Sequence, residues 1–319
     1  PLSLRLSDVT FGTGVSPFDT VVGDHPGGSP MKRRLAQLPL HGGQAPAWLF
    51  RRMTRLAGAV TMAVVDARGP EEMLRRLADP WWFQAFGCAL GFDWHSSGLT
   101  TVTCGAMKEA AKRLGRDLGL FVAGGKAMEG RKAPREIMEA SDRHAVTGGD
   151  RLVHASRTSA KVDSAAVQDH YQIYHHSFFF APSGAWCVVQ QGLNEETAWA
   201  RRYHWLGETV DDFVCEPHAA IRDAEGPGTG DRRPATLLNM VAREAGANRR
   251  GSAALVRGNP DALLAEAERL TEGPTLFAPS HHPVLAADVN LARLRKIVRA
   301  AHERNTQDFE TLLGTEGVG

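Results

Sequence analysis

The chain has 319 residues, of which 43% are hydrophobic and 23% are charged, and its formal net charge at pH 7 is +1. This composition can bury a hydrophobic core, and the length suggests one large domain or two moderate ones. The net charge gives no sign of a strongly basic or strongly acidic protein. No apolar run reaches the roughly 18 residues that a membrane-spanning helix needs.

Residues 1–30 begin with Pro1, are rich in Gly and Pro, and show no helical periodicity. They lack the basic region and the apolar run of a secretory signal. We therefore interpret 1–30 as a disordered leader or a non-native upstream extension, and Met31 as the natural start.

Four helices are predicted in the next part of the chain. The first begins at Pro46, the second at Pro70 and the third at Pro80, since proline favours the first helical turn. The expected core face of the first helix contains Trp48, Leu49, Met53, Leu56 and Val60. A loop with Asp93 and His95 follows, and Thr100 or Thr101 is expected to cap the fourth helix.

A short apolar run then leads into the segment "AGGKAMEGRKAP", which we predict to be a Gly-rich loop. It does not have the residue order of a P-loop. Lys126 in this loop is a candidate contact for a phosphate group.

Residues 149–176 are predicted to form one long helix. One stripe of that helix contains several kinds of hydrogen-bonding and titratable side chain but none of the glutamates that are common on a solvated face. It consists of Arg157, Lys161, Ser164, Gln168, Tyr171 and His175. Such a stripe suggests the wall of an active site, although a solvated face or a buried polar network is the alternative.

Lys161 is the candidate nucleophile of this stripe. A lysine in a partly apolar site loses its charge more easily and can form a Schiff base with an opened deoxyribose. Asp163 is the nearby carboxylate, about 100° round the helix, and His175 or His176 would transfer protons. The remaining catalytic candidates are Gln168, Tyr171, Asp93 and His95.

No cofactor is predicted, but a divalent metal is left open as an alternative. Its ligands would come from a dispersed set without the spacing of a known metal motif: Asp93, His95, His154, Asp163, His175, Glu216 and His218. The four cysteines are far apart and form no Cys-x-x-Cys pair, which predicts reduced thiols in a cytoplasmic protein.

The periodicity changes after residue 176. The segment "SFFFAPSGAWCVVQQG" predicts a β-hairpin at 177–191, and "AWARRYHWL" predicts a third strand. Residues 222–234 have the composition of a linker or surface loop. Helices are expected at "ATLLNMVAREAGANRR", at "NPDALLAEAERL" with Asn259 as its cap, and at "VNLARLRKIVRAAHERN".

The C-terminal part of the chain carries the candidate DNA-binding residues. A short helix at 308–313 precedes the turn Gly317-Val318-Gly319, which is how a helix-hairpin-helix unit begins; its backbone N–H groups hold a phosphate. A plain C-cap and turn is the alternative. The preceding helix has a basic face that supplies the further candidates Arg295, Lys296 and Arg299. Arg157 and Lys126, from earlier segments, complete the set of candidate DNA contacts.

The sequence thus predicts a mostly helical α+β fold with a small antiparallel sheet and the start of a C-terminal helix-hairpin-helix. The expected organisation is a helical core with the hairpin at 31–221, a linker at 222–234, and a C-terminal helical region at 235–319 that we expect to be truncated.

Several segments resemble one family. They include "DPWWFQAFGCALGFDWHSSGLTTVTCGAMKEA", "ASRTSAKVDSAAVQDHYQIYHHSFFF" and "VVQQGLN". From about Met31 onward the chain resembles the uncharacterised domain-of-unknown-function family 763. The resemblance implies a glycine where this chain has His170, and it implies no mechanism.

The residues favour a DNA-processing protein of the repair type, with lyase or glycosylase chemistry on a damaged or abasic nucleotide. The alternatives are a metal-dependent nuclease, a non-catalytic DNA-binding or adaptor protein, and a metabolic enzyme for a small phosphorylated substrate. DNA is the expected partner, and no membrane partner is expected.

Overall fold

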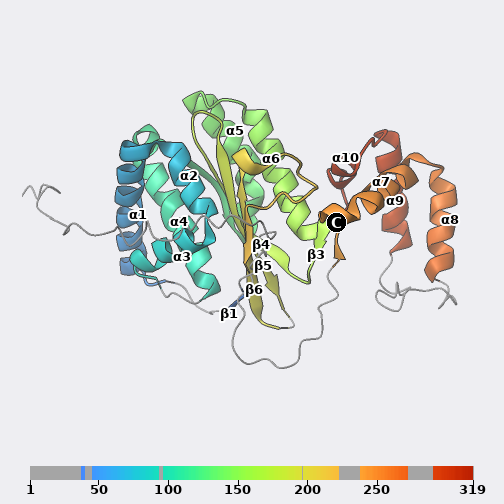
Figure 1. Cartoon of the computed structure of the whole chain (residues 1–319), viewed down its shortest axis with the longest axis horizontal. Coiled ribbons are helices and arrows are strands. Elements are labelled where there is room, and N and C mark those ends of the chain that lie inside the picture. Colours follow the sequence, from blue (N-terminus) through green and yellow to red (C-terminus); the bar gives the residue numbers. More distant parts are fainter. Residues whose placement is uncertain are drawn as a thin grey trace, which may run out of the picture. The chain divides into compact units, whose positions relative to one another are not determined.

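The structure is a computed structural model that describes residues 37–39, 45–92, 96–195, 197–222, 238–271 and 290–318 (Figure 1). The predicted leader at 1–30, the candidates Asp93, His95 and Gly319, and nearly all of the predicted linker at 222–234 lie outside the described residues.

An antiparallel sheet forms the centre of the molecule, with the strand order β1-β6-β5-β4-β2 and with β7 paired to β6. Its strands are β1 (Gln37–Pro39), β2 (Phe121–Lys126), β4 (Gln172–Phe180), β5 (Trp186–Asn194), β6 (Trp199–Leu206) and β7 (Ala220–Arg222). A separate pair joins β3 (Val167–Gln168) to β8 (Leu238–Asn239). The predicted hairpin and the predicted third strand are confirmed as β4, β5 and β6.

Helices cover both faces of this sheet (Figure 1). One layer contains α1 (Ala47–Arg68), α2 (Pro70–Ala78), α3 (Pro80–Ala89) and α4 (Ser97–Leu114), and the other contains α5 (Ala133–His144) and α6 (Gly149–Lys161). Phe179 packs with the first layer, whereas its neighbours Phe178 and Phe180 pack with the second. A strand buried on both faces needs apolar residues in succession, which explains the run "FFF".

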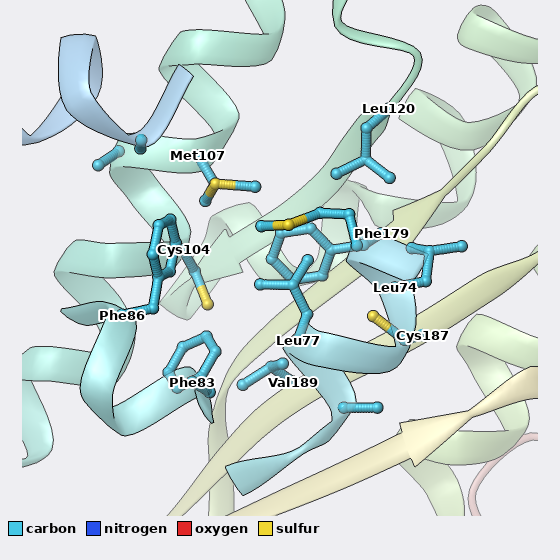
Figure 2. Close-up of a cluster of buried hydrophobic side chains, with 14 of the residues drawn as sticks. Leu74, Leu77, Phe83, Phe86, Cys104, Met107, Leu120, Phe179, Cys187 and Val189 are labelled. Carbon is cyan, nitrogen blue, oxygen red and sulfur yellow. The ribbon is translucent and has the colours of Figure 1, made fainter. Parts of the chain in front are cut away.

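The core on the first face joins the helices to the sheet. Figure 2 shows Leu74 and Leu77 of α2, Phe83 of α3 and Met107 of α4 with Phe179 of the sheet. The prediction for α1 is only partly right, because Met53 is buried while Trp48 and Leu56 are 61% and 37% exposed. The buried face of α1 instead uses small residues: Thr54, Ala57, Gly58 and Thr61.

The C-terminal part is helical, as predicted. It contains α7 (Gly246–Arg257), α8 (Pro260–Thr271), α9 (Leu291–Glu303) and α10 (Phe309–Leu313). Asn259 caps α8 by accepting hydrogen bonds from the backbone N–H groups of Asp261 and Ala262, and Asp308 caps α10. The helix predicted from residue 235 is wrong in its first part, because β8 and a 3-10 turn precede α7.

The long helix predicted at 149–176 is wrong in its second half. Helix α6 ends at Lys161, a π turn follows at Val162–Ala166, and the chain then enters β3 and β4. The segment "QIYHHSFFF" is rich in aromatic residues and pairs along its length with β5, so strand pairing overrides the local helical pattern. The polar stripe therefore does not continue past Ser164.

Two smaller predictions also need correction. The segment at Lys126 is not a loop, because β2 pairs with β4 and aligns Lys126 with His175 before the 3-10 segment η3 (Ala127–Lys132) begins. Helix α4 starts at Ser97, so Thr100 and Thr101 lie inside it and do not cap it.

The four cysteines are free thiols, as predicted, and Cys104 and Cys187 are buried. None of the helices in the described ranges combines the length and the hydropathy that a bilayer crossing requires. The mostly helical α+β class with an antiparallel sheet is confirmed, and the helix-hairpin-helix stays a prediction.

Candidate functional site

A pocket of about 1230 Å³ lies where η3, α6, the start of β4 and α10 meet. Its wall carries four cationic side chains, Arg131, Arg157, Lys161 and Arg304. Its carboxylates are Asp308 and Glu310, both from the segment around α10. A concave site with convergent cations suits a ligand with several negative charges.

Three residues of the predicted stripe, Arg157, Lys161 and Ser164, line this pocket. They lie on α6 and its π turn at a spacing of three and four residues, so they share one face. A fourth stripe residue, His175, also lines the pocket but reaches it from β4, whereas Gln168 and Tyr171 lie elsewhere. Gln168 is exposed on β3, and the ring of Tyr171 packs 4.4 Å from the guanidinium of Arg201.

Lys161 is partly buried, and its Nζ donates a hydrogen bond to the backbone carbonyl of Val318. Arg293 donates to the neighbouring carbonyl of Gly317 at 3.1 Å. Burial lowers the pKa of the Lys161 amine from its ordinary value, and the positive charge of Arg293 lowers it further. Both effects favour the neutral amine that a nucleophilic lysine needs.

Asp163 is not the partner of Lys161. Its carboxylate is buried on the sheet side of the π turn, where Trp205 Nε1 donates to it at 2.9 Å. Gln190 Nε2 and His218 Nε2 also bond to it. The carboxylates that line the pocket are those of Asp308 and Glu310, and Glu310 Oε1 lies 2.8 Å from His154 Nε2.

His176 lines the pocket from β4 and lies between α6 and β5. Its Nε2 is 2.9 Å from the Ser156 hydroxyl, and its Nδ1 is 2.8 Å from Gln190 Oε1. The Gln190 amide nitrogen donates to the Ser159 carbonyl at 3.0 Å and to Asp163, so Oε1 is the acceptor atom. His176 therefore carries its proton on Nδ1, and Nε2 accepts a hydrogen bond from Ser156.

Both histidines of β4 are buried, and burial lowers the pKa of each. The pKa of His175 falls to about 3, with further contributions from His176 and Lys126. The lowering at His176 is opposed by the hydrogen bond to Gln190 and by the charge of Asp163. His175 is therefore neutral near pH 7, and its Nε2 contacts the Ser177 hydroxyl at 3.0 Å.

The predicted DNA-binding residues are spread over several places. Lys126 is exposed at the end of β2. On α9, Lys296 is exposed, while Arg295 and Arg299 each lie 3.4 Å from a carboxylate of α8. These ion pairs partly neutralise the basic face.

The C-terminal turn has Gly317 at φ +89°, a left-handed conformation that favours glycine. The N–H group of Val318 donates to the carbonyl of Thr315 at 3.2 Å. That N–H group is therefore already used within the turn, and phosphate binding at this turn stays a prediction.

Among the described residues, the predicted metal ligands are not gathered into one group. Within the ranges that the structure describes, no three His, Cys, Asp or Glu side chains come together as a metal site would require. Asp163 and His218 are the members of the predicted set that bond to each other.

Ser156, Gln190 and Arg304 were not predicted from the sequence, whereas Arg131 belongs to the Gly-rich segment for which phosphate binding was an alternative. A signal for Ser156 did exist, because Ser156, Ser159 and Asp163 recur at helical spacing on the apolar face of α6. Polar residues on a face that is otherwise buried must find hydrogen-bond partners. Gln190 carried the same signal in the apolar strand "WCVVQQG".

Comparison with known families finds a match to a family model. The profile of the family described as "Protein of unknown function (DUF763)" covers residues 34–319. No curated protein and no solved structure matches the chain.

Proposed function

Because the chain belongs to the DUF763 family, whose description assigns no activity, we propose a function from the site itself: a DNA-processing enzyme of the lyase or glycosylase type. The observation that carries this proposal is Lys161, an amine with a lowered pKa in a pocket of about 1230 Å³ that other cations surround. Lys161 would attack a damaged or abasic nucleotide that has left the base stack.

The surrounding cations support a substrate with phosphate groups. Arg131, Arg157 and Arg304 come from three separate segments and line the same pocket as Lys161. Guanidinium groups bind phosphate oxygens through paired hydrogen bonds, and they would hold the phosphates on either side of the reacting sugar.

The chemistry would begin with attack of Lys161 Nζ on C1′ of the open sugar and loss of water to form a Schiff base. Elimination then requires removal of a C2′ proton, while the bond from C3′ to the phosphate oxygen breaks. Glu310 and its partner His154 are the pocket groups suited to accept that proton, in place of the buried Asp163. Lys161 must first release the carbonyl of Val318.

The test uses duplex DNA with one abasic site, borohydride and a chelator, followed by a denaturing gel. We expect a covalent adduct with the unsubstituted chain and no adduct with Lys161→Arg, which keeps a positive donor beside Val318 but cannot form a Schiff base. Lys112→Arg is the control, because Lys112 is an exposed lysine paired with Glu109 on α4. No adduct with the unsubstituted chain would rule out the lyase, and an adduct that survives Lys161→Arg would rule out Lys161 as the nucleophile.

The same cations favour one second candidate, an enzyme for a small phosphorylated substrate. In that case, inorganic phosphate should protect the pocket from chemical modification as well as an abasic oligonucleotide does. A metal-dependent nuclease would cleave DNA only without the chelator. A non-catalytic DNA-binding protein would show salt-sensitive binding that Lys161→Ala weakens only modestly.

The free cysteines are consistent with a reducing compartment, and we propose the cytoplasm as the site of action.

A further inference from the structure

We propose that Ser156 is a second nucleophile of this pocket, activated by His176 for the hydrolysis of phosphoesters. The carrying observation is the hydrogen-bonded series Ser156, His176, Gln190 and Asp163, which runs from the pocket wall into the core. This inference rests on the proposed function in one respect, that the substrate carries phosphate groups, because the same cations would serve Lys161 and Ser156.

The protonation pattern of the series gives His176 the role of a base. Gln190 Oε1 accepts from His176 Nδ1, so the lone pair of Nε2 faces the Ser156 hydroxyl at 2.9 Å. A serine hydroxyl that donates to an imidazole, whose other nitrogen donates to a fixed acceptor, is the arrangement of an activated serine nucleophile. Gln190 and Asp163 are positioning residues, since they act through His176.

The backbone around His176 keeps this geometry in place. His176 and Gln190 are direct partners in the β4–β5 ladder. On the other side, β2 approaches so closely that a side chain at Gly124 would lie 2.2 Å from the carbonyl oxygen of His176. Gly124 has φ +85°, which a residue with a side chain rarely adopts. The fold thus holds the base rigidly behind α6.

The site limits the substrate to a small, anionic reacting group. Ser156 lines the pocket but is only 2% exposed, so it lies at the floor and not at the rim. Arg157 and Lys161 follow it on the same helix and also line the pocket. A phosphoryl group could reach the floor while the rest of a nucleotide or oligonucleotide fills the wider space above.

The proposed reaction has two steps. Ser156 Oγ attacks phosphorus, its proton passes to His176 Nε2, and the bond from phosphorus to the leaving alcohol breaks as that alcohol takes the proton from Nε2. A water molecule then gives a proton to Nε2 and attacks phosphorus of the phosphoserine. The bond from phosphorus to Oγ breaks as Oγ takes the proton from Nε2, which restores Ser156 and releases phosphate from a monoester substrate or a phosphomonoester from a diester. Arg157 and Lys161 would stabilise the negative charge on the phosphoryl oxygens.

The first experiment uses a fluorophosphonate probe on the full chain, with mass spectrometry of its peptides. Attack by Ser156 forms the bond from Oγ to phosphorus and releases fluoride, so a single label should appear on Ser156. Ser164 is the matched control, because it lines the same pocket and is more exposed, but its hydroxyl donates to the Ala160 carbonyl and contacts no imidazole. Label on Ser164 in preference to Ser156, or no label, would overturn the proposal.

Variants test the role of His176. Ser156→Ala and His176→Gln should each lower the rate of bis(p-nitrophenyl) phosphate hydrolysis at least about 100-fold. Ser252→Ala should leave it unchanged, because the Ser252 hydroxyl donates to the Asn248 carbonyl on α7 and does not line the pocket. If Ser156→Ala fails to fold, the site of labelling in the unsubstituted chain gives the answer alone. Hydrolysis that survives in a folded Ser156→Ala chain would overturn the proposal.

The pH dependence separates positioning from a structural role. The labelling rate should fall in acid as His176 becomes protonated, at a pH below its ordinary value of 6.5. Because the bond to Gln190 raises the pKa of His176, Gln190→Leu should move this fall to lower pH as well as lower the rate. If the pH dependence of the labelling rate is unchanged in Gln190→Leu, Gln190 has no positioning role.

The two centres of the pocket can be tested separately. Lys161→Arg should still be labelled at Ser156, and Ser156→Ala should still form the borohydride adduct at Lys161. Failure of one experiment therefore does not imply failure of the other.

Discussion

Replacement of Asp163 by alanine should reduce the free energy of unfolding by about 4 kcal/mol. The side chain is fully buried, and its carboxylate accepts hydrogen bonds from Trp205 Nε1 at 2.9 Å, from Gln190 Nε2 and from His218 Nε2. Each buried donor left without an acceptor costs about 1–3 kcal/mol. Gln190 keeps its bond to the Ser159 carbonyl, which reduces the total.

The magnitude also agrees with the roughly 3–5 kcal/mol that the loss of one partner costs in a buried charged network. Asp163→Asn should cost less, about 2 kcal/mol, because one oxygen acceptor remains while the new amide group opposes the existing donors. The free energy of unfolding should therefore increase in the order Asp163→Ala, Asp163→Asn, unsubstituted chain.

The assay is equilibrium unfolding in urea, followed by far-ultraviolet circular dichroism. Asp261→Ala is the control, because the Asp261 side chain is 80% exposed and pairs with Arg299 only at 3.4 Å. That change should cost less than about 0.5 kcal/mol. A cost below about 1 kcal/mol for Asp163→Ala, with an unchanged denaturant slope, would refute the buried acceptor role.

Three further predictions concern the backbone and the buried histidine. Gly124→Ala should cost more than about 3 kcal/mol, since its φ is +85° and the new methyl group would lie 2.2 Å from the carbonyl oxygen of His176. Gly115→Ala, at φ +58° and ψ −132° with open space around it, has backbone strain but no clash and should cost less, about 1–3 kcal/mol, in the same urea titration. His175 has a pKa of about 3 in the folded chain against 6.5 when unfolded, so its contribution is complete above pH 6.5 and is lost as the pH falls toward 3. The free energy of unfolding measured across that range should fall by on the order of 4 kcal/mol, and His175→Asn should show a weaker pH dependence. His170 has φ +66° and is exposed, so His170→Gly should raise stability by about 0.5–1 kcal/mol in thermal unfolding, and a decrease would contradict the strain argument.

The sequence predicted those elements in which local signals agree with the tertiary structure. Proline at the first turn located the starts of α1, α2 and α3, and Asn259 located the start of α8. The turn residues between the apolar runs located the hairpin of β4 and β5. These signals act within a few residues, so they survive in any fold.

Helical spacing predicted the part of the site that lies on α6. Arg157, Lys161 and Ser164 share a face because helical spacing alone requires it, and all three line the pocket. His175 also lines the pocket, but from strand β4 and not from a continued helix, and Tyr171 does not line it, because strand pairing with β5 overrides the helical pattern beyond the π turn. A pattern of polar residues does not show which distant strand will form hydrogen bonds with their backbone.

Tertiary structure alone decided which polar groups meet. Asp163 lies two residues from Lys161, yet it bonds to Trp205 and His218, which are distant in the sequence. Glu310, the pocket carboxylate that pairs with His154, lies more than 140 residues after Lys161 in the sequence. Helical spacing fixes the direction of a side chain relative to its own helix, whereas the partners that surround it depend on how sheet and helices pack, because burial forces each polar group to the nearest available donor or acceptor.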